Sequence, residues 1–432
     1  MLLLPLILYL ILKTSKLIMP SAQNIKQGLK SDFEVNSGSW EDKQYAFETQ
    51  AIHSGVRPDP VTGAILTPVY QCTTFVQESI EKYCEKGYSY TRSSNPTVTA
   101  LEDKLNALEG GAGCTMYATG MAATTTAIST FMSAGDHAII TNCSYGGTNR
   151  AARVFFTRMG MEFTFVGMDD DELAEVKAAI KPNTKMILSE TPANPTCTLT
   201  DLAALSKLAK ANKLVHVCDN TFVTPFICKP LEYGVDVVLA STTKFVDGHN
   251  ITVGGALIAA TKEMSDSLRF TQNILGNNMS PQVAFYQLQT VKTMSLRVKK
   301  QSDNAMAIAT FLEAHPAVDK VCYPGLASHP QKKIADKQHK GNNHGGMLWF
   351  EVKGGTAAGQ KLMDTVPRPW SLCENLGAAE SIITCPAVMT HANMLKEDRL
   401  KVGITDGFIR VSCGIEDVED LIHALKGALD KL

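Results

Sequence analysis

The chain has 432 residues, of which 44% are hydrophobic and 19% charged, and its formal net charge at pH 7 is −2. This length and composition suit two domains, or one large domain with an appendage, and they exclude an intrinsically disordered chain. The near-zero net charge, with basic residues scattered along the chain, argues against a nucleic-acid partner.

The first twelve residues, MLLLPLILYLIL, form an unbroken apolar run that is followed by Lys13 and Lys16. The run is shorter than the roughly 20 residues that a membrane-spanning helix needs. No positive residue precedes it, and no clear small-residue cleavage site follows it. Two interpretations stay open, a signal peptide or membrane anchor and an extension ahead of a second start at Met19. Together with the polar stretch that follows, residues 1–45 are interpreted as an apolar extension and a flexible arm.

From about Tyr45 onward, short β-branched runs alternate with amphipathic helical patterns. The predicted strands are residues 137–141, 184–190, 214–220 and 235–241, and the predicted helices between them include residues 171–180 and 202–212. Near-continuous apolar strands that alternate with helices indicate a parallel sheet covered on both faces. We therefore predict an α/β large domain over residues 46–280.

After about Pro281 the pattern changes. A long helical region, residues 283–315, leads into a smaller mixed segment that begins with GMLWFEVKGG. Residues 281–432 are therefore predicted to form a second, smaller α+β domain that packs on the first.

The eleven cysteines and ten histidines give no motif for disulfides or metal. No C-x-x-C, H-x-x-x-H or H-E-x-x-H spacing is present, and several cysteines lie inside apolar runs. Scattered thiols of this kind are typical of a reducing compartment, so we expect a cytoplasmic protein without a metal site.

Polar side chains follow three of the predicted strands. Asp219 follows LVHVC, Ser241 to Lys244 follow VDVVLA, and Glu190 to Asn194 follow KMILS. In open α/β sheets, ligands bind at the carboxyl ends of the strands. These stretches therefore form one candidate site.

The stretch YATGMAATTTAI places Gly120 and Met121 at the start of a predicted helix. Backbone N–H groups at such a helix start bind phosphate, and the hydroxyls of Ser241 and Thr243 could donate to the same phosphate. No Walker motif is present. Considered alone, an ordinary helix start capped by Thr119 explains this stretch as well.

Asp219 and Lys244 add two further chemical functions. A carboxylate buried at a strand end needs a cationic partner, and a protonated pyridine nitrogen is one. A lysine can form a Schiff base with an aldehyde when a desolvated pocket lowers its pKa enough to leave the amine partly neutral. Together with a phosphate cradle, these groups predict pyridoxal phosphate as the cofactor.

Six segments carry a resemblance to a known family: YTRSSNPT, SYGGTNR, ETPANPT, VCDNTF, ASTTKFVDGH and MTHANMLKEDR. In order and without large gaps from about Ala46 to the end, the chain resembles the Cys/Met-metabolism family of pyridoxal-phosphate enzymes, and most closely its cystathionine γ-lyases and γ-synthases. The resemblance implies fold type I, the aminotransferase-like architecture. It also implies an amino-acid substrate, and a homotetramer made of two dimers whose active sites lie between protomers.

The resemblance also assigns residue roles. Lys244 would be the Schiff-base lysine and proton carrier, and Asp219 the partner of the pyridinium. Tyr145 would stack on the ring and assist the leaving group. The remaining assignments are the phosphate ligands of the same subunit (Gly120, Met121, Ser241, Thr243), those of the neighbouring subunit (Tyr90, Arg92), and the substrate-binding group (Asn194, Arg410, Glu374, Asn375).

Four positions bear on the choice within the family. Thr119 stands where many members have serine, and Asn375 also replaces a usual serine, which affects the positioning of lysine and carboxylate. Gly147 occupies the place where methionine γ-lyases typically carry cysteine. Glu374 matches an acidic position of cystathionine γ-lyases and γ-synthases, where it could bind the distal ammonium of cystathionine.

These positions and the stretch PGLASHPQ favour γ-cleavage of cystathionine to cysteine, 2-oxobutyrate and ammonia, a trans-sulfuration step of cysteine biosynthesis and methionine metabolism. A γ-synthase, which joins cysteine to an O-activated homoserine, needs the same residues and is the alternative. Cystathionine β-lyase and methionine γ-lyase rank behind both. An alternative of another class is a non-catalytic structural family member, but a chain free of catalytic constraint could have lost Lys244, Asp219, Tyr145 and Arg410, and this one carries all four.

Overall fold

The computed structural model describes residues 45–432 except residues 84, 171, 390–395 and 402. The apolar extension, and with it the question of a signal, anchor or second start, lies outside the described residues. By contacts, residues 56–68 belong to a separate unit, and in them Asp59 Oδ1 accepts a hydrogen bond of 2.8 Å from the backbone N–H of Thr62. Residues 47–55 and 69–432 form the other unit, which holds both sheets.

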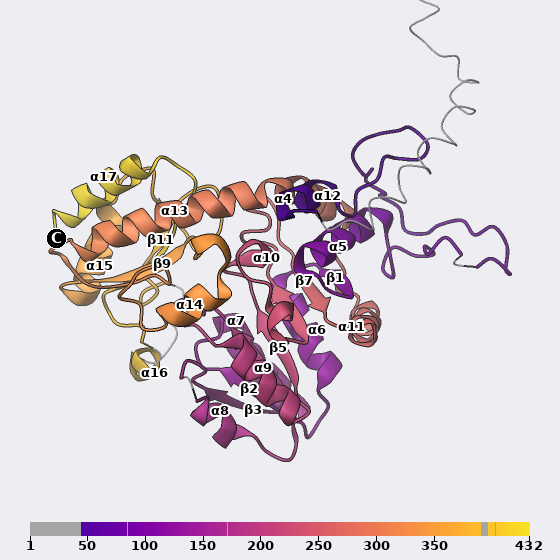
Figure 1. The fold of residues 1–432 in the computed structure, drawn as a ribbon, viewed down its shortest axis with the longest axis horizontal. Coiled ribbons are helices and arrows are strands. Elements are labelled where there is room, and N and C mark those ends of the chain that lie inside the picture. The colour runs from indigo at the N-terminus through magenta and orange to yellow at the C-terminus, as the bar shows by residue number, and fades with distance from the viewer. Residues whose placement is uncertain (1–44, 84, 171, 390–395, 402) are drawn as a thin grey trace, which may run out of the picture. The chain divides into compact units, whose positions relative to one another are not determined.

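The larger sheet has seven strands in the order β1-β7-β6-β5-β4-β2-β3 (Figure 1). Their bounds are β1 Gly113–Tyr117, β2 His137–Thr141, β3 Glu162–Val166, β4 Thr184–Glu190, β5 Val215–Asp219, β6 Val237–Ala240 and β7 Gly255–Ala259. The four strands expected from the sequence are present as β2, β4, β5 and β6. They pair in parallel with their neighbours, except where β6 meets β7.

Strand β7 departs from the expected all-parallel sheet. It pairs antiparallel with both β6 and β1. The reason lies in its connection, because residues 241–254 return from β6 without a crossover helix, and a parallel neighbour normally requires one. This returning loop carries Lys244 and stays at the carboxyl edge of the sheet.

Both faces of the larger sheet are covered, as the alternation of its side chains requires. On β2, Ile140 packs into a cluster with Ala127 of α6 and Leu268 of α11, whereas Ile139 packs into another cluster with Leu205 of α9. The helices around this sheet are α5 Pro96–Glu109, α6 Gly120–Phe131, α7 Gly146–Arg150, α8 Ala174–Ala179, α9 Leu202–Ala211, α10 Thr224–Ile227 and α11 Lys262–Leu275, with the short α4 Phe47–His53 packed on α5.

The predicted helical region after Pro281 is α12 Pro281–Thr290, a 3₁₀ turn and the long α13 Met294–Glu313, which leads to the second sheet (Figure 1). That sheet has the order β10-β11-β12-β9-β8. Its strands are β8 Val318–Cys322, β9 Met347–Val352, β10 Ser371–Leu372, β11 Ile382–Thr384 and β12 Phe408–Ser412, accompanied by α14 Lys332–Gln338, α15 Gly355–Thr365, α16 Lys396–Lys401 and α17 Val418–Leu429.

Side chains of α13 and α17 pack on this smaller sheet and close its core, in which Phe350 and Ile409 are fully buried. The two sheets are of the predicted kinds, one mostly parallel and one mostly antiparallel. The boundary at residues 280 and 281 stays a prediction. Within the described ranges, no helix has the length and apolar character needed to cross a membrane.

Candidate active site

A cavity of about 580 Å³ lies where β4, β5 and β6 end and α6 begins. Its lining includes most of the residues predicted for the site: Gly120, Met121, Tyr145, Asn194, Asp219, Ser241, Thr243, Lys244, Glu374, Asn375 and Arg410. The carboxyl ends of parallel strands meet at one edge, which explains why segments far apart in sequence converge here. The smaller sheet contributes Arg410 from β12 and the loop that carries Glu374 and Asn375.

The start of α6 faces the loop after β6. Thr119 caps the helix, since its Oγ1 accepts a hydrogen bond of 2.9 Å from the N–H of Ala122. A Cβ atom built on Gly120 would lie 2.8 Å from both Cβ and Oγ of Ser241, so only glycine permits this approach. On the same side, the Thr243 hydroxyl accepts from the N–H of Gly254 at 3.0 Å. A helix N-terminus, a glycine and two hydroxyls thus form a cradle of the kind that binds phosphate.

Asp219 ends β5 and is directed to the cavity. One carboxylate oxygen accepts hydrogen bonds from Thr221, from the backbone N–H at 3.0 Å and from Oγ1 at 2.6 Å. Burial raises the pKa of Asp219 to about 6, while the bonds from Thr221 act to lower it. In the described part of the chain no lysine or arginine pairs with this carboxylate, so it can take a cation supplied by a ligand.

Lys244 lies in the loop between β6 and β7, with its Nζ donating to Oδ1 of Asn375 at 2.6 Å. Burial lowers the pKa of Lys244 to about 8; the charge of Arg410 lowers it further, and that of Glu374 raises it. Asn375 in turn donates to Asn250, which donates to Glu380 at 2.9 Å. The amine is therefore partly neutral near physiological pH and is held at one end of a hydrogen-bonded chain.

Arg410, on β12, is only 4% exposed. Its Nη1 donates to Oδ1 of Asn194 at 3.2 Å, and its Nη2 donates to the backbone oxygen of Glu374 at 3.0 Å. Burial lowers the pKa of Arg410 to about 10, so the guanidinium stays charged. A planar cation beside an amide is suited to a bidentate grip on a carboxylate.

Tyr145 lines the cavity with a side chain that is 47% exposed. Its backbone N–H donates to Oε2 of Glu190 at 2.8 Å, and the N–H of Asn194 donates to Oε1 of the same carboxylate at 3.0 Å. Glu190 ends β4 beside Asp219 in the sheet register. Burial and the neighbouring Asp219 carboxylate raise the pKa of Glu190.

The segment with Tyr90 and Arg92 does not reach the cavity of its own chain. Both side chains are exposed, and neither lines that cavity. Arg92 Nη1 donates to Oδ1 of Asn273 at 2.9 Å, and the guanidinium carbon lies 5.7 Å from the centre of the Tyr90 ring. The predicted role of this pair at a neighbouring subunit's phosphate stays a prediction.

Three further residues line or support the site, although no role was predicted for them from the sequence. Arg150 lines the cavity from the end of α7, inside the recognised SYGGTNR segment. Thr221, inside VCDNTF, orders Asp219 and also accepts from the N–H of Ser241 at 2.8 Å. Glu190 is the first residue of ETPANPT. Its position at the end of a predicted strand was the only feature of the sequence that indicated a role in the site. In the described ranges, no group of three or more His, Cys, Asp or Glu side chains is placed to hold a metal.

These residues fit pyridoxal phosphate. The cradle at Gly120 suits its phosphate, the buried carboxylate of Asp219 suits a protonated ring nitrogen, and the amine of Lys244, with its lowered pKa, suits an aldehyde. The three features converge on one cavity, which is a stronger indication than any of them alone.

Residues 48–430 match the family model described as "Cys/Met metabolism PLP-dependent enzyme". Cystathionine gamma-lyase of Bacillus subtilis (strain 168) is 42% identical over 385 residues, covering 89% of this chain and 99% of that protein. L-methionine gamma-lyase of Fusobacterium nucleatum subsp. polymorphum is 41% identical, covering 91% of this chain and all of that protein. Cystathionine gamma-synthase of Mycobacterium bovis is also 41% identical, with coverage of 88% and 96%.

Among solved structures, the cystathionine gamma-lyase from Lactobacillus plantarum complexed with L-serine is similar to this chain with a TM-score of 0.85 at 40% identity, covering 89% of this chain and 99% of that one. The structure of metB from Corynebacterium glutamicum gives the same TM-score at 39% identity, with coverage of 90% and 98%. The fold is therefore that of fold type I. Taken with the cavity, these matches show that the chain belongs to the Cys/Met-metabolism family of pyridoxal-phosphate-dependent enzymes, the carbon–sulfur lyases and synthases.

Proposed function

We propose that this enzyme cleaves L-cystathionine at its γ carbon to give L-cysteine, 2-oxobutyrate and ammonia. The relatives span γ-lyases, γ-synthases, β-lyases and methionine γ-lyases at similar identity, so the choice rests on the cavity. The observation that carries it is Glu374, an exposed side chain on the cavity lining whose carboxylate has no hydrogen-bond or ion-pair partner in the described part of the chain. Cystathionine has a distal ammonium that such a carboxylate can bind.

The other end of the substrate would meet Arg410 and Asn194. Their side chains already lie 3.2 Å apart, and both line the cavity. The guanidinium would take the α-carboxylate in a bidentate grip while Asn194 fixes its orientation. With Glu374 at the distal ammonium, the substrate is held at both ends. Its position between the two ends then determines the carbon that lies beside Lys244.

When bound, pyridoxal phosphate supplies an aldehyde for amines and a ring that accepts the electrons of a broken C–H bond. The amine of Lys244, displaced by that of the substrate, would then carry protons from the α and β carbons, a task for which a pKa near 8 is suitable. Tyr145, at the mouth of the cavity, would stack on the ring and assist the departing γ thiolate. Water completes the release of 2-oxobutyrate and ammonia.

The cofactor would be held by Gly120, Met121, Ser241 and Thr243 through its phosphate and by Asp219 through its ring nitrogen. Tyr90 and Arg92 of a neighbouring copy would complete the phosphate site. This assignment requires a dimer whose two chains share their active sites. We also propose the homotetramer and the cytoplasmic location that were expected from the sequence. The shared site is supported by the position of Tyr90 and Arg92, which do not line the cavity of their own chain.

Gly147 argues against methionine γ-cleavage. A Cβ atom at this position would lie 2.4 Å from Cε1 of Tyr145 and 2.8 Å from Sδ of Met121. A cysteine here would therefore displace the tyrosine ring that we assign to stacking. In this chain, the Tyr145 ring and the Met121 sulfur lie in the space that a side chain at position 147 would need.

The test is a product assay on the purified holoenzyme. With cystathionine alone we expect 2-oxobutyrate and cysteine, whereas β-cleavage would give pyruvate and homocysteine. A second assay supplies an O-activated homoserine with cysteine. Efficient cystathionine synthesis without 2-oxobutyrate release would reverse the assignment in favour of the γ-synthase, and a protein that stays colourless after addition of the cofactor would indicate the non-catalytic alternative.

A further inference from the structure

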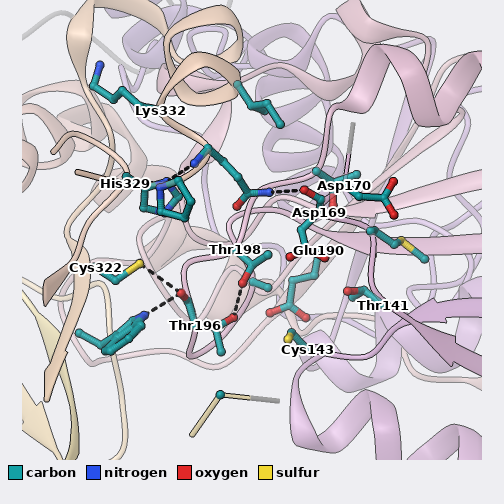
Figure 2. A pocket seen from close by; sticks show the side chains of 18 of the residues that line it. Thr141, Cys143, Asp169, Asp170, Glu190, Thr196, Thr198, Cys322, His329 and Lys332 are labelled. Atoms are coloured by element: carbon teal, nitrogen blue, oxygen red, sulfur yellow. Dashed lines mark hydrogen bonds between the residues drawn. The ribbon is translucent and has the colours of Figure 1, made fainter. Parts of the chain in front are cut away.

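A second cavity, of about 890 Å³, lies beside the first at the carboxyl ends of β2, β3 and β4. Figure 2 shows Asp169, Asp170 and Thr141 on one side of it and Cys322, His329 and Lys332 on the other. The first wall belongs to the loops of the larger sheet, and the second to β8 and to the segment that leads into α14. The cavity thus occupies the edge of the sheet at which ligands bind, at the ends of β2 and β3 and of β4, which it shares with the active site.

The spacing of the two walls is fixed by hydrogen bonds between them. Trp349 Nε1, from β9, donates to the backbone oxygen of Thr196 at 2.7 Å. Gln331 donates to the backbone oxygen of Asp169 at 3.1 Å and accepts from the N–H of Leu199 at 2.7 Å. The cavity is therefore preformed, as small-molecule sites usually are.

The charges on the two walls are opposite. Lys320, Lys332 and Lys333 line the smaller-sheet side, and Asp169 and Asp170 line the larger-sheet side. Lys332 pairs with Asp336. Lys320 lies over the ring of Trp349, with Nζ 5.4 Å from the ring centre.

Among the described residues, charged groups without an ion-pair partner remain on both walls, and all three are exposed to solvent. In the described ranges, neither Lys320 nor Lys333 has a carboxylate partner, and no hydrogen bond or ion pair reaches the carboxylate of Asp169. A ligand with one ammonium and one carboxylate would satisfy both walls at once, whereas a simple anion or cation would satisfy only one.

Glu190 connects the two cavities, since it lines both. It is 6% exposed, and its two carboxylate oxygens hold the backbone N–H groups of Tyr145 and Asn194 at 2.8 and 3.0 Å. Any displacement of Glu190 by a ligand in the second cavity would therefore move two residues of the active site. Two further links join the linings: Ala193 of the second cavity precedes Asn194 of the first, and Trp349 pairs with Arg410 in the smaller sheet.

We propose that the second cavity is a regulatory site for a zwitterionic α-amino acid, which binds between the two walls and alters turnover through Glu190. The ammonium would lie towards Asp169 and the carboxylate towards Lys320 and Lys333. Because the ligand contacts loops of both sheets, it also fixes one sheet against the other.

Trp349 gives a signal for this cavity, because it lines the second cavity and does not line the first. It also pairs with Arg410 of the active site in the smaller sheet, so the signal is assigned with the charge variants below. The holoenzyme is titrated with L-norleucine, which carries both charges, and with hexanoate and pentylamine, each of which lacks one of them. We expect a saturable change of tryptophan fluorescence with L-norleucine and a much weaker change with the other two. Trp349→Phe should lose this change, which assigns the signal to Trp349, and the charge variants of the second cavity then show which cavity the ligand occupies.

Two charge variants then locate the ligand. Asp169→Asn and Lys333→Ala should each weaken the fluorescence-detected binding by about fivefold, since both groups are partly solvated. Trp349→Phe responding like the wild type, or unaltered binding in both charge variants, would place L-norleucine elsewhere and overturn the proposal. So would the absence of any saturable change.

The coupling is tested by the rate of 2-oxo acid release, whichever sulfur amino acid proves to be the substrate, at saturating and at zero L-norleucine. The ratio of the two rates should differ from one in the wild type and should move towards one in Asp169→Asn at the same concentration. Glu190→Gln should still bind L-norleucine, with the ratio changed. Binding at Trp349 with a ratio of one would disprove the regulatory role and leave the proposed function untouched.

Discussion

The cavity lining and the segment with Tyr90 and Arg92 differ in what a single chain can do with them. The residues assigned to the lysine, the ring nitrogen and the substrate carboxylate converge on one cavity, where Lys244 and Arg410 are tied to partners within 3.2 Å. Tyr90 and Arg92 belong to a motif that is equally typical of the family. Both are exposed, however, and Arg92 donates a hydrogen bond to Asn273 and not to a residue of the cavity. If Tyr90 and Arg92 act at the phosphate of a neighbouring copy, as proposed, a complete set of motifs in the sequence does not form a complete site in one chain.

The largest effect is expected from the residue at the centre of the cavity. Lys244→Ala removes the proton carrier, so kcat should fall by at least about 10³-fold, within the range for a general acid–base residue. Steady-state 2-oxo acid release measures it. Lys210→Ala, an exposed lysine on α9, is the matched control and should retain wild-type activity.

Arg92→Ala tests the other half of the comparison. If Arg92 donates to the phosphate in a neighbouring copy, the Kd for pyridoxal phosphate should rise by about 10- to 100-fold, as expected for a charge-assisted hydrogen bond. Absorbance titration of the apo-protein measures the Kd, with exposed Arg158→Ala as control.

Subunit mixing sharpens this result. Co-refolded Lys244→Ala and Arg92→Ala chains should regain activity at sub-saturating cofactor, because some hybrid sites combine both intact residues. A lower melting temperature for Arg92→Ala with an unchanged Kd would mean instead that Arg92 only holds Asn273.

Glu374→Gln addresses substrate choice and should have a smaller effect. The change keeps the shape of the side chain but removes its charge, so KM for cystathionine should rise by about fivefold, in line with a solvated ion pair. The kcat/KM for homocysteine, which lacks the distal ammonium, should stay unchanged. Equal losses on both substrates would show that Glu374 acts through the backbone of its loop.

The smallest effect concerns the pH dependence of Lys244. Only the neutral amine attacks an aldehyde, so the rate at which apo-protein takes up pyridoxal phosphate should increase through a pH of about 8 and level off above it. Asn375→Asp places a carboxylate beside the ammonium, favours the charged form and should shift this profile upward by about one pH unit. In Asn375→Ser the midpoint should stay near that of the wild type.

The sequence predicted the strands that build the cavity because their apolar runs are long and end in polar residues. It did not predict β7, since GALIA lacks any feature that encodes strand direction, which follows from the connection through residues 241–254. The role of Glu190 was also missed. That carboxylate binds backbone N–H groups, and no side-chain motif records where backbone groups lie.

The hydrogen-bonded chain from Lys244 through Asn375 and Asn250 to Glu380 could not be predicted either, because tertiary folding alone brings its two loops together. Asn375 was recognised as a departure from the family pattern, yet its consequence required the geometry. The second cavity includes parts of ETPANPT and PGLASHPQ, but neither stretch was interpreted as part of a second site. The rest of its lining comes from strand ends and loops without a recognised motif.

The central claim, that Lys244 anchors the cofactor in this cavity, is tested most directly by reductive trapping. The holoenzyme is treated with borohydride, digested and mapped by mass spectrometry. We expect the cofactor mass on the peptide that contains Lys244, with no such adduct in Lys244→Ala. An adduct on another lysine in the wild type, or none in a protein that binds the cofactor and turns over substrate, would contradict it.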